Sequence, residues 1–307
     1  MSKIDKIYIT CCKNDVLFTR ICVASIRYWY PQIPVYLIKE YLYGDFNTSE
    51  IEKNWNVSVL STNRKKFGRG FPKYEALFLQ NGERVLAIDS DIVFGGRVIE
   101  ALEVFDEDFI VSGGKVDDYH SAYVKNFFYI DQLFKYDPSY IFPGFCFNSG
   151  QIVATCGEIA ESDFADFVDW SSAPLIKKRP NIIHMEQGIL NYVLTKKLQL
   201  GQISINFISF HWWANGVNNK EPILLKIKNG DGFPTLIHWA GEKVPILSRL
   251  ALKDVLYLYE DFYYSKIKFG VFLRYFRYLY MYFKYAFFIL PGKRFQILRK
   301  SINCHKN

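Results

Sequence analysis

Val85-Leu86-Ala87-Ile88-Asp89-Ser90-Asp91-Ile92-Val93-Phe94 places two carboxylates, two positions apart, at the end of an apolar run. Such a run predicts a buried β-strand, and extended geometry projects alternate side chains to one side. Two carboxylates in apolar surroundings repel one another unless a divalent cation, a basic partner or protonation relieves them. Oxygen ligands suit magnesium or manganese. We therefore favour a shared cation over the alternatives, a solvated turn or a helix N-cap.

Strand-like and helix-like segments alternate upstream of this stretch. The apolar run Lys6–Cys12 is followed by a polar loop, Lys13–Asp15, and by a helical pattern through Trp29. Further short strands are predicted at residues 34–38, 57–60 and 84–88. This alternation predicts an α/β fold with a mostly parallel sheet flanked by helices. Ligands of such sheets bind beyond the carboxyl ends of the strands, which directs attention to the loops after Thr10 and Ile88.

Composition narrows the class of protein. Of the 307 residues, 50% are hydrophobic and 18% are aromatic, which excludes a disordered or coiled-coil chain. The net charge of +7 favours anionic partners, whether nucleic acid, phospholipid or a sugar diphosphate. The six cysteines lack metal-binding spacing and no secretory signal is evident, so we expect reduced thiols in a cytoplasmic protein.

Three later segments matter as much as the first. They are Phe147-Asn148-Ser149-Gly150-Gln151-Ile152-Val153, Glu186-Gln187-Gly188-Ile189-Leu190-Asn191 and His238-Trp239-Ala240-Gly241-Glu242-Lys243. Together with the Asp-x-Asp strand end, and in this order, they resemble the motifs of GT-A glycosyltransferases. The resemblance spans residues 6–245 and is greatest to the retaining family 8 galactosyl- and glucosyltransferases. It implies a Rossmann-like GT-A fold and a hexosyltransferase that uses a nucleotide sugar, UDP-Gal or UDP-Glc, to glycosylate a glycan acceptor with retention.

The resemblance implies that Asp89, Asp91 and His238 bind the metal ion. An imidazole among oxygen ligands favours manganese, with magnesium as the alternative. By itself, His238 would be interpreted as a strand-end histidine bonded to backbone. Ser90, between the two carboxylates, is grouped with the donor-binding residues.

Donor-binding residues also follow from the resemblance. The loop after the first strand would hold the base and ribose through Thr10, Cys11, Cys12 and Asn14. Gly241 would let backbone approach the diphosphate, and Lys243 would supply a charge to its oxygens. Lys73 would lie over the donor phosphate or sugar, although a solvated lysine is the alternative. Cys11 and Cys12 are expected to be ordinary thiols, because no histidine lies near them in the sequence.

The sugar pocket would be lined by Asn148, Ser149, Glu186 and Gln187, whose polar groups pair with sugar hydroxyls. Gln187 is assigned a positioning or charge-stabilising role beneath the anomeric carbon. If the enzyme instead inverts configuration, Glu186 is the candidate base. A catalytically silent scaffold of the same fold is the other alternative. The basic stretch 64–70 lacks the aromatic platforms of nucleic-acid-binding proteins, so no nucleic acid partner is expected.

The C-terminal region differs from the rest of the chain in its basic and aromatic composition. Lys266, Arg274, Arg277 and Lys284 fall on one face of a predicted helix rich in aromatic residues. These charges interrupt any apolar span of about 20 residues, so we expect a helix lying on an anionic membrane rather than crossing it. The alternative is a helix packed on the rest of the chain. We divide the chain into a catalytic domain, 1–264, and a membrane-association segment, 265–307, and expect a peripheral enzyme at the inner face of the cell membrane acting on a lipid-linked glycan.

Overall fold

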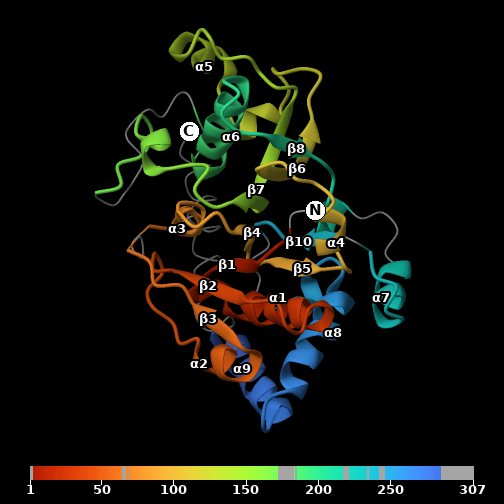
Figure 1. Cartoon of the computed structure of the whole chain (residues 1–307). Coiled ribbons are helices and arrows are strands. Elements are labelled where there is room, and N and C mark those ends of the chain that lie inside the picture. The colour runs from red at the N-terminus through yellow and green to blue at the C-terminus, as the bar shows by residue number, and fades with distance from the viewer. Residues whose placement is uncertain are drawn as a thin grey trace, which may run out of the picture.

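A seven-stranded sheet forms the centre of the computed structural model, which describes residues 3–63, 67, 68, 70–171, 183, 185–216, 221–233, 235–241 and 246–284 (Figure 1). The strand order is β3-β2-β1-β4-β7-β6-β8, and among these strands β7 alone runs antiparallel. The strands are β1 Lys6–Cys12, β2 Val35–Glu40, β3 Val57–Val59, β4 Arg84–Asp89, β6 Phe109–Lys115, β7 Phe145–Thr155 and β8 Ile205–Phe207. The predicted mostly parallel α/β sheet is confirmed.

Two hydrophobic cores cover the two faces of this sheet, because alternate side chains of each strand point to opposite faces. In β4, Leu86 and Ile88 belong to one core, and Val85 and Ala87 to the other. The first core packs against α1 and α8, and the second against α6. The helices are α1 Val16–Trp29, α2 Ser49–Trp55, α3 Tyr74–Leu77, α4 Ile99–Leu102, α5 Ile130–Tyr136, α6 Met185–Gln199, α7 Glu221–Lys228, α8 Lys253–Ser265 and α9 Gly270–Lys284.

A second, three-stranded sheet lies at the carboxyl end of β4. Its order is β5-β10-β9, formed by β5 Ile92–Phe94, β10 Leu236–His238 and β9 His211–Trp213. Asp89 is the last residue of β4, whereas Ser90 and Asp91 form a turn into β5. The carboxylates therefore converge across a turn between two sheets, and not along one extended strand as the sequence suggested.

A bulge in β7 shapes the same region. Between the pairs Val111–Ile152 and Gly113–Phe147, β6 contributes Ser112 alone, whereas β7 contributes residues 148–151. A bulge of this kind bends a strand and re-aims its side chains. Here it redirects the Asn148-Ser149-Gly150 segment toward the end of β4.

The C-terminal helices pack back on the rest of the molecule (Figure 1). Arg277 forms a two-pronged ion pair with Glu50 of α2, at 2.5 and 3.0 Å, and Arg274 pairs with Glu260 of α8 at 2.7 Å. The arginines of the predicted basic face thus contact the protein's own carboxylates. Lys266 follows α8 and lies outside α9, and the predicted boundary at residue 264 falls within the last turn of α8.

The outward surface of α9 is aromatic. Its exposed side chains include Phe272, Tyr275, Phe276, Tyr280, Tyr282 and Phe283. Within the described part of the chain, no helix combines the length and the apolar character needed to span a membrane. Residues 285–307 of the predicted membrane segment lie outside the described residues.

Candidate active site

Three potential metal ligands meet where the two sheets join. Asp89 ends β4, Asp91 lies in the turn before β5, and His238 ends β10. Their ligand atoms all lie within 4.8 Å of one another, and His238 Nε2 is 3.2 Å from Asp91 Oδ1. A backbone hydrogen bond from Trp239 N to Asp91 O, 3.0 Å long, ties the end of β10 to the turn. Residues almost 150 positions apart in the sequence are thereby held together.

The donor set fits a divalent cation. Burial above all, together with the charge of Asp91, raises the pKa of the Asp89 carboxyl despite the opposing effects of Lys73 and His238. A cation would relieve this unfavourable confinement of negative charge. Two carboxylates and one imidazole suit manganese, and magnesium less well.

Gly150 makes the close approach possible. A Cβ at this position would lie 2.6 Å from both Asn148 Oδ1 and His238 Cε1, and 3.1 Å from Asp89 Oδ2. Any side chain would displace at least one of these groups. Glycine at this point of the β7 bulge thus allows the candidate metal ligands and the predicted sugar-pocket residues to lie side by side.

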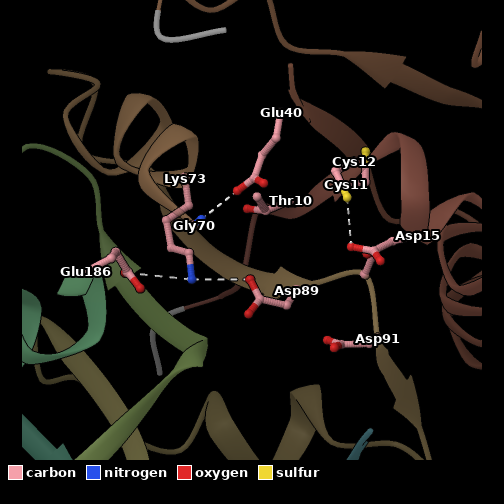
Figure 2. Close-up of a pocket in the computed structure, with 11 residues that line it drawn as sticks. Thr10, Cys11, Cys12, Asp15, Glu40, Gly70, Lys73, Asp89, Asp91 and Glu186 are labelled. Atoms are coloured by element: carbon pink, nitrogen blue, oxygen red, sulfur yellow. Dashed lines mark hydrogen bonds and ion pairs between the residues drawn. The ribbon is translucent and has the colours of Figure 1, made fainter. Parts of the chain in front are cut away.

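Lys73 lies beneath the site rather than in solvent. Its side chain is 2% exposed, and Nζ lies 2.7 Å from Ser149 O, 3.2 Å from Asp89 Oδ1 and 3.8 Å from Glu186 Oε1. Figure 2 shows the ammonium group between the two carboxylates. Burial lowers the pKa of Lys73, but Asp89 and Glu186 outweigh it and the net pKa is raised, so the lysine is charged. It holds a positive charge between two carboxylates that line the cavity.

The predicted sugar-pocket residues form one hydrogen-bonded group between β7 and the first turn of α6. Asn148 Nδ2 and Ser149 N both donate to Gln187 Oε1, at 2.9 and 3.3 Å. Glu186 accepts from Ser149 Oγ at 2.9 Å and from Tyr74 OH at 3.3 Å. With its oxygen engaged, Gln187 offers its amide NH₂ to a ligand.

A cavity extends from the metal ligands to the carboxyl ends of β1 and β2 (Figure 2). Of the residues predicted to bind the donor, it is lined by Thr10, Cys11, Cys12, Lys73, Asp89 and Ser90, together with Asp91 and Glu186. Thr10 Oγ1 is buried and makes no hydrogen bond with the described residues, so it is placed to bond a ligand. Burial raises the pKa of Cys11, in keeping with the expectation of an unreactive thiol.

Three further lining residues were missed by sequence reasoning: Asp15, Glu40 and Gly70. Asp15 is buried and its carboxylate accepts a hydrogen bond from Cys12 Sγ at 3.1 Å, and Glu40 accepts one from Gly70 N at 2.5 Å. Two of them could have been predicted from their position in the chain. Asp15 follows β1 and Glu40 ends β2, and ligands of parallel sheets bind at these carboxyl ends of the strands.

Other described residues predicted to bind the donor are not among those that line this cavity. Asn14 is exposed and is not among the residues that line the cavity. Gly241 follows β10 in a turn with φ of 74°, a conformation that favours glycine. Lys243 lies outside the described residues, so its predicted role stays a prediction.

Comparisons with known proteins identify the architecture. No protein-family model and no curated sequence matches the chain. The bifunctional glycosyltransferase WbbM is similar in structure, with a TM-score of 0.54 and 14% identity, covering 84% of this chain and 50% of WbbM. The galactosyltransferase LgtC, solved with donor and acceptor sugar analogues, has a TM-score of 0.52 and 12% identity, covering 85% of this chain and 95% of LgtC. The apo-form glycosyltransferase GlyE of Streptococcus pneumoniae TIGR4 has a TM-score of 0.50 and 15% identity, covering 92% of this chain and 64% of GlyE.

These similarities define the fold. The chain spans half the length of WbbM and nearly all of LgtC. At 12 to 15% identity they establish architecture alone, and the chain has the GT-A glycosyltransferase fold that the motif resemblance predicted.

Proposed function

We propose that the chain is a metal-dependent hexosyltransferase that moves a hexose from a nucleotide sugar, UDP-Gal or UDP-Glc, to a glycan acceptor with retention of configuration. The observation that carries this proposal is the meeting of Asp89, Asp91 and His238 at one end of a polar cavity. The fold, shared with known glycosyltransferases, supports it.

The cation, manganese or magnesium, would be held by these three side chains and would neutralise charge on the departing diphosphate. The chain's own residues would bind and orient the donor around it. Thr10, which pairs in register with Asp89, and Asp15, which follows β1, line the same cavity, and the base and ribose would bind beside them. Glu186 also lines the cavity, and Gln187 is bonded to Asn148 and Ser149 next to it. Both would fix the sugar hydroxyls.

Retention is favoured over inversion by the state of Glu186, the candidate base. Its two oxygens already accept hydrogen bonds from Tyr74 and Ser149, and Lys73 lies nearby. A general base needs an oxygen directed at the acceptor hydroxyl. The bonds from Tyr74 and Ser149 hold the buried Glu186 carboxylate in place, which supports a role for Glu186 in binding sugar hydroxyls and a positioning role for Gln187.

The first experiment is hydrolysis of a panel of UDP-, GDP- and CMP-sugars with and without manganese. We expect slow, manganese-dependent release of nucleotide from one UDP-hexose, and loss of that release when EDTA is added. NMR of the product formed with an acceptor then gives the anomeric configuration. If the protein neither hydrolyses nor binds any of these donors, the silent-scaffold alternative replaces this proposal.

We also propose that the C-terminal region attaches the enzyme to an anionic membrane that carries a lipid-linked acceptor. The outward face of α9 presents the rings listed above, and aromatic side chains favour the lipid interface. Because Arg274 and Arg277 are paired internally, charge attraction would come mainly from the basic residues that follow, which are Lys293, Arg294, Arg299, Lys300 and Lys306.

Liposome cosedimentation tests the membrane proposal. Wild type is expected to bind phosphatidylglycerol vesicles, and a triple variant, Phe272→Ser, Phe276→Ser and Phe283→Ser, is expected to bind about ten-fold more weakly. These rings lie on one exposed helical face, so the fold should tolerate the changes. Val104→Ser with Leu225→Ser is the matched control, since both are exposed elsewhere. Equal binding of the triple variant and the control contradicts the proposal.

A further inference from the structure

Trp213 presents an exposed indole beside the metal ligands. It ends β9 and pairs in register with His238, on whose imidazole it stacks with ring centroids 5.0 Å apart and planes 24° apart. The side chain is 41% exposed, whereas Trp29, Trp55 and Trp239 are buried and Trp212 packs on Phe233. An exposed tryptophan loses the benefit of burial unless a ligand covers it.

The indole is held firmly in place. His211 packs edge-on against it, with centroids 5.0 Å apart and planes 88° apart. His211 Nδ1 lies 2.7 Å from Ser112 Oγ, which accepts a hydrogen bond from Phe210 N at 3.1 Å and so can donate its proton to the imidazole. A surface ordered before binding loses little conformational entropy when a ligand arrives.

The position of Trp213 separates it from the nucleotide end of the site. The cavity lined by Thr10, Asp15 and Asp89 contains no residue of β9. In the small sheet, β9 lies on the far side of β10 from β5, the strand that follows Asp91. Its neighbour His211 contacts Ser112 of β6, on the side of the large sheet away from β1. Trp213 therefore borders the metal site from the side opposite the base.

We propose that Trp213 is the platform on which a sugar ring of the glycan acceptor stacks, an inference that rests on the proposed glycosyl transfer. One face of a hexose carries C–H groups and its edge carries hydroxyls, so a flat apolar indole with a polar rim complements it. Stacking on a ring that contacts a metal ligand would place the acceptor next to the donor sugar. The nucleotide base is excluded as the occupant because it would bind in the cavity, which Trp213 does not line.

The test measures binding of methyl β-D-galactopyranoside and methyl β-lactoside to the protein. Saturation-transfer NMR in the presence of manganese and UDP detects the binding. Trp213→Ala is expected to weaken glycoside binding by about ten-fold or more, and Trp213→Phe by less because a ring remains. The dissociation constant of UDP with manganese should change by less than about two-fold. Tyr119→Ala, at a residue that is 42% exposed, is the matched control and should bind like wild type.

The outcomes separate this inference from the proposed function. Failure of wild type to bind UDP with manganese would contradict the proposed function itself. The platform assignment alone is wrong if wild type binds UDP but neither glycoside. It is also wrong if wild type and Trp213→Ala bind UDP and bind the glycosides equally tightly. Parallel loss of UDP and glycoside binding in Trp213→Ala would also overturn it, because the indole would then support the donor site.

Discussion

Asp91→Asn is expected to reduce manganese-dependent hydrolysis of the sugar nucleotide by about a thousand-fold or more. Asp91 is buried, lies 3.2 Å from His238 Nε2, and accepts a backbone hydrogen bond from Trp239, so an amide in its place keeps the local structure but loses the charge that would bind the cation. A metal ion at a diphosphate supplies several kcal/mol of charge stabilisation, and each 1.36 kcal/mol is a factor of ten in rate. Initial rates of nucleotide release across a manganese titration measure the loss.

A double variant shows whether Asp91 and His238 contribute to activity through one shared metal ion or independently of each other. If Asp91 and His238 act through one cation, Asp91→Asn combined with His238→Ala loses little more activity than either change alone. Calorimetric titration of manganese should show loss of binding in all three proteins. Asp131→Asn, an exposed carboxylate on α5, controls for charge and should behave as wild type. Additive losses, or retained manganese binding, would contradict the assignment.

The part of the fold that follows from local pattern was predictable. The strands β1, β2 and β4 are short, mainly apolar runs whose side chains are largely buried on both faces, so their sequence alone indicates parallel strands. Asp89 and Asp91 stood out because they follow such a run. The motif resemblance supplied His238, which the structure places next to Gly150, and Gln187, which it bonds to Asn148 and Ser149.

Residues whose environment depends on tertiary contacts were not predictable. Lys73 follows a glycine-rich basic stretch, which is ordinarily a solvated position. It is buried because η2 (Phe71–Lys73) packs against β1 and β2, and because its ammonium group contacts Ser149 of β7 and Glu186 of α6. Trp213 and Trp212 are neighbours in a short strand, and only the pairing with β10 shows which of them faces the metal site.

The C-terminal helix shows how charge pattern misleads without tertiary structure. The spacing of Arg274 and Arg277 indicated a basic face, and helical geometry does bring them to one side. The partners of that face, Glu50 and Glu260, come from α2 and α8, and nothing in the helix itself identifies them. Aromatic residues of the same helix, such as Phe272, Phe276 and Phe283, are the ones exposed to solvent.

Lys73→Met is expected to lower the free energy of unfolding by about 3 kcal/mol in the metal-free protein. The ammonium group is 2% exposed and lies between Asp89 and Glu186, so its removal leaves two confined carboxylates without their shared counter-charge. Urea unfolding measures the change. Lys135→Met, at an exposed lysine of α5, is the control and should cost less than about 0.5 kcal/mol.

Two further measurements show that the loss arises from the carboxylates. Saturating manganese and UDP should reduce the penalty of Lys73→Met, because the cation then balances the charge of Asp89. Adding Glu186→Gln should recover part of the lost stability, since one uncompensated charge is removed. A penalty that stays the same with ligand and in the double variant would mean that Lys73 stabilises the fold by packing alone. Lys73 would then have a structural role only, and its proposed link to metal binding through Asp89 would be wrong.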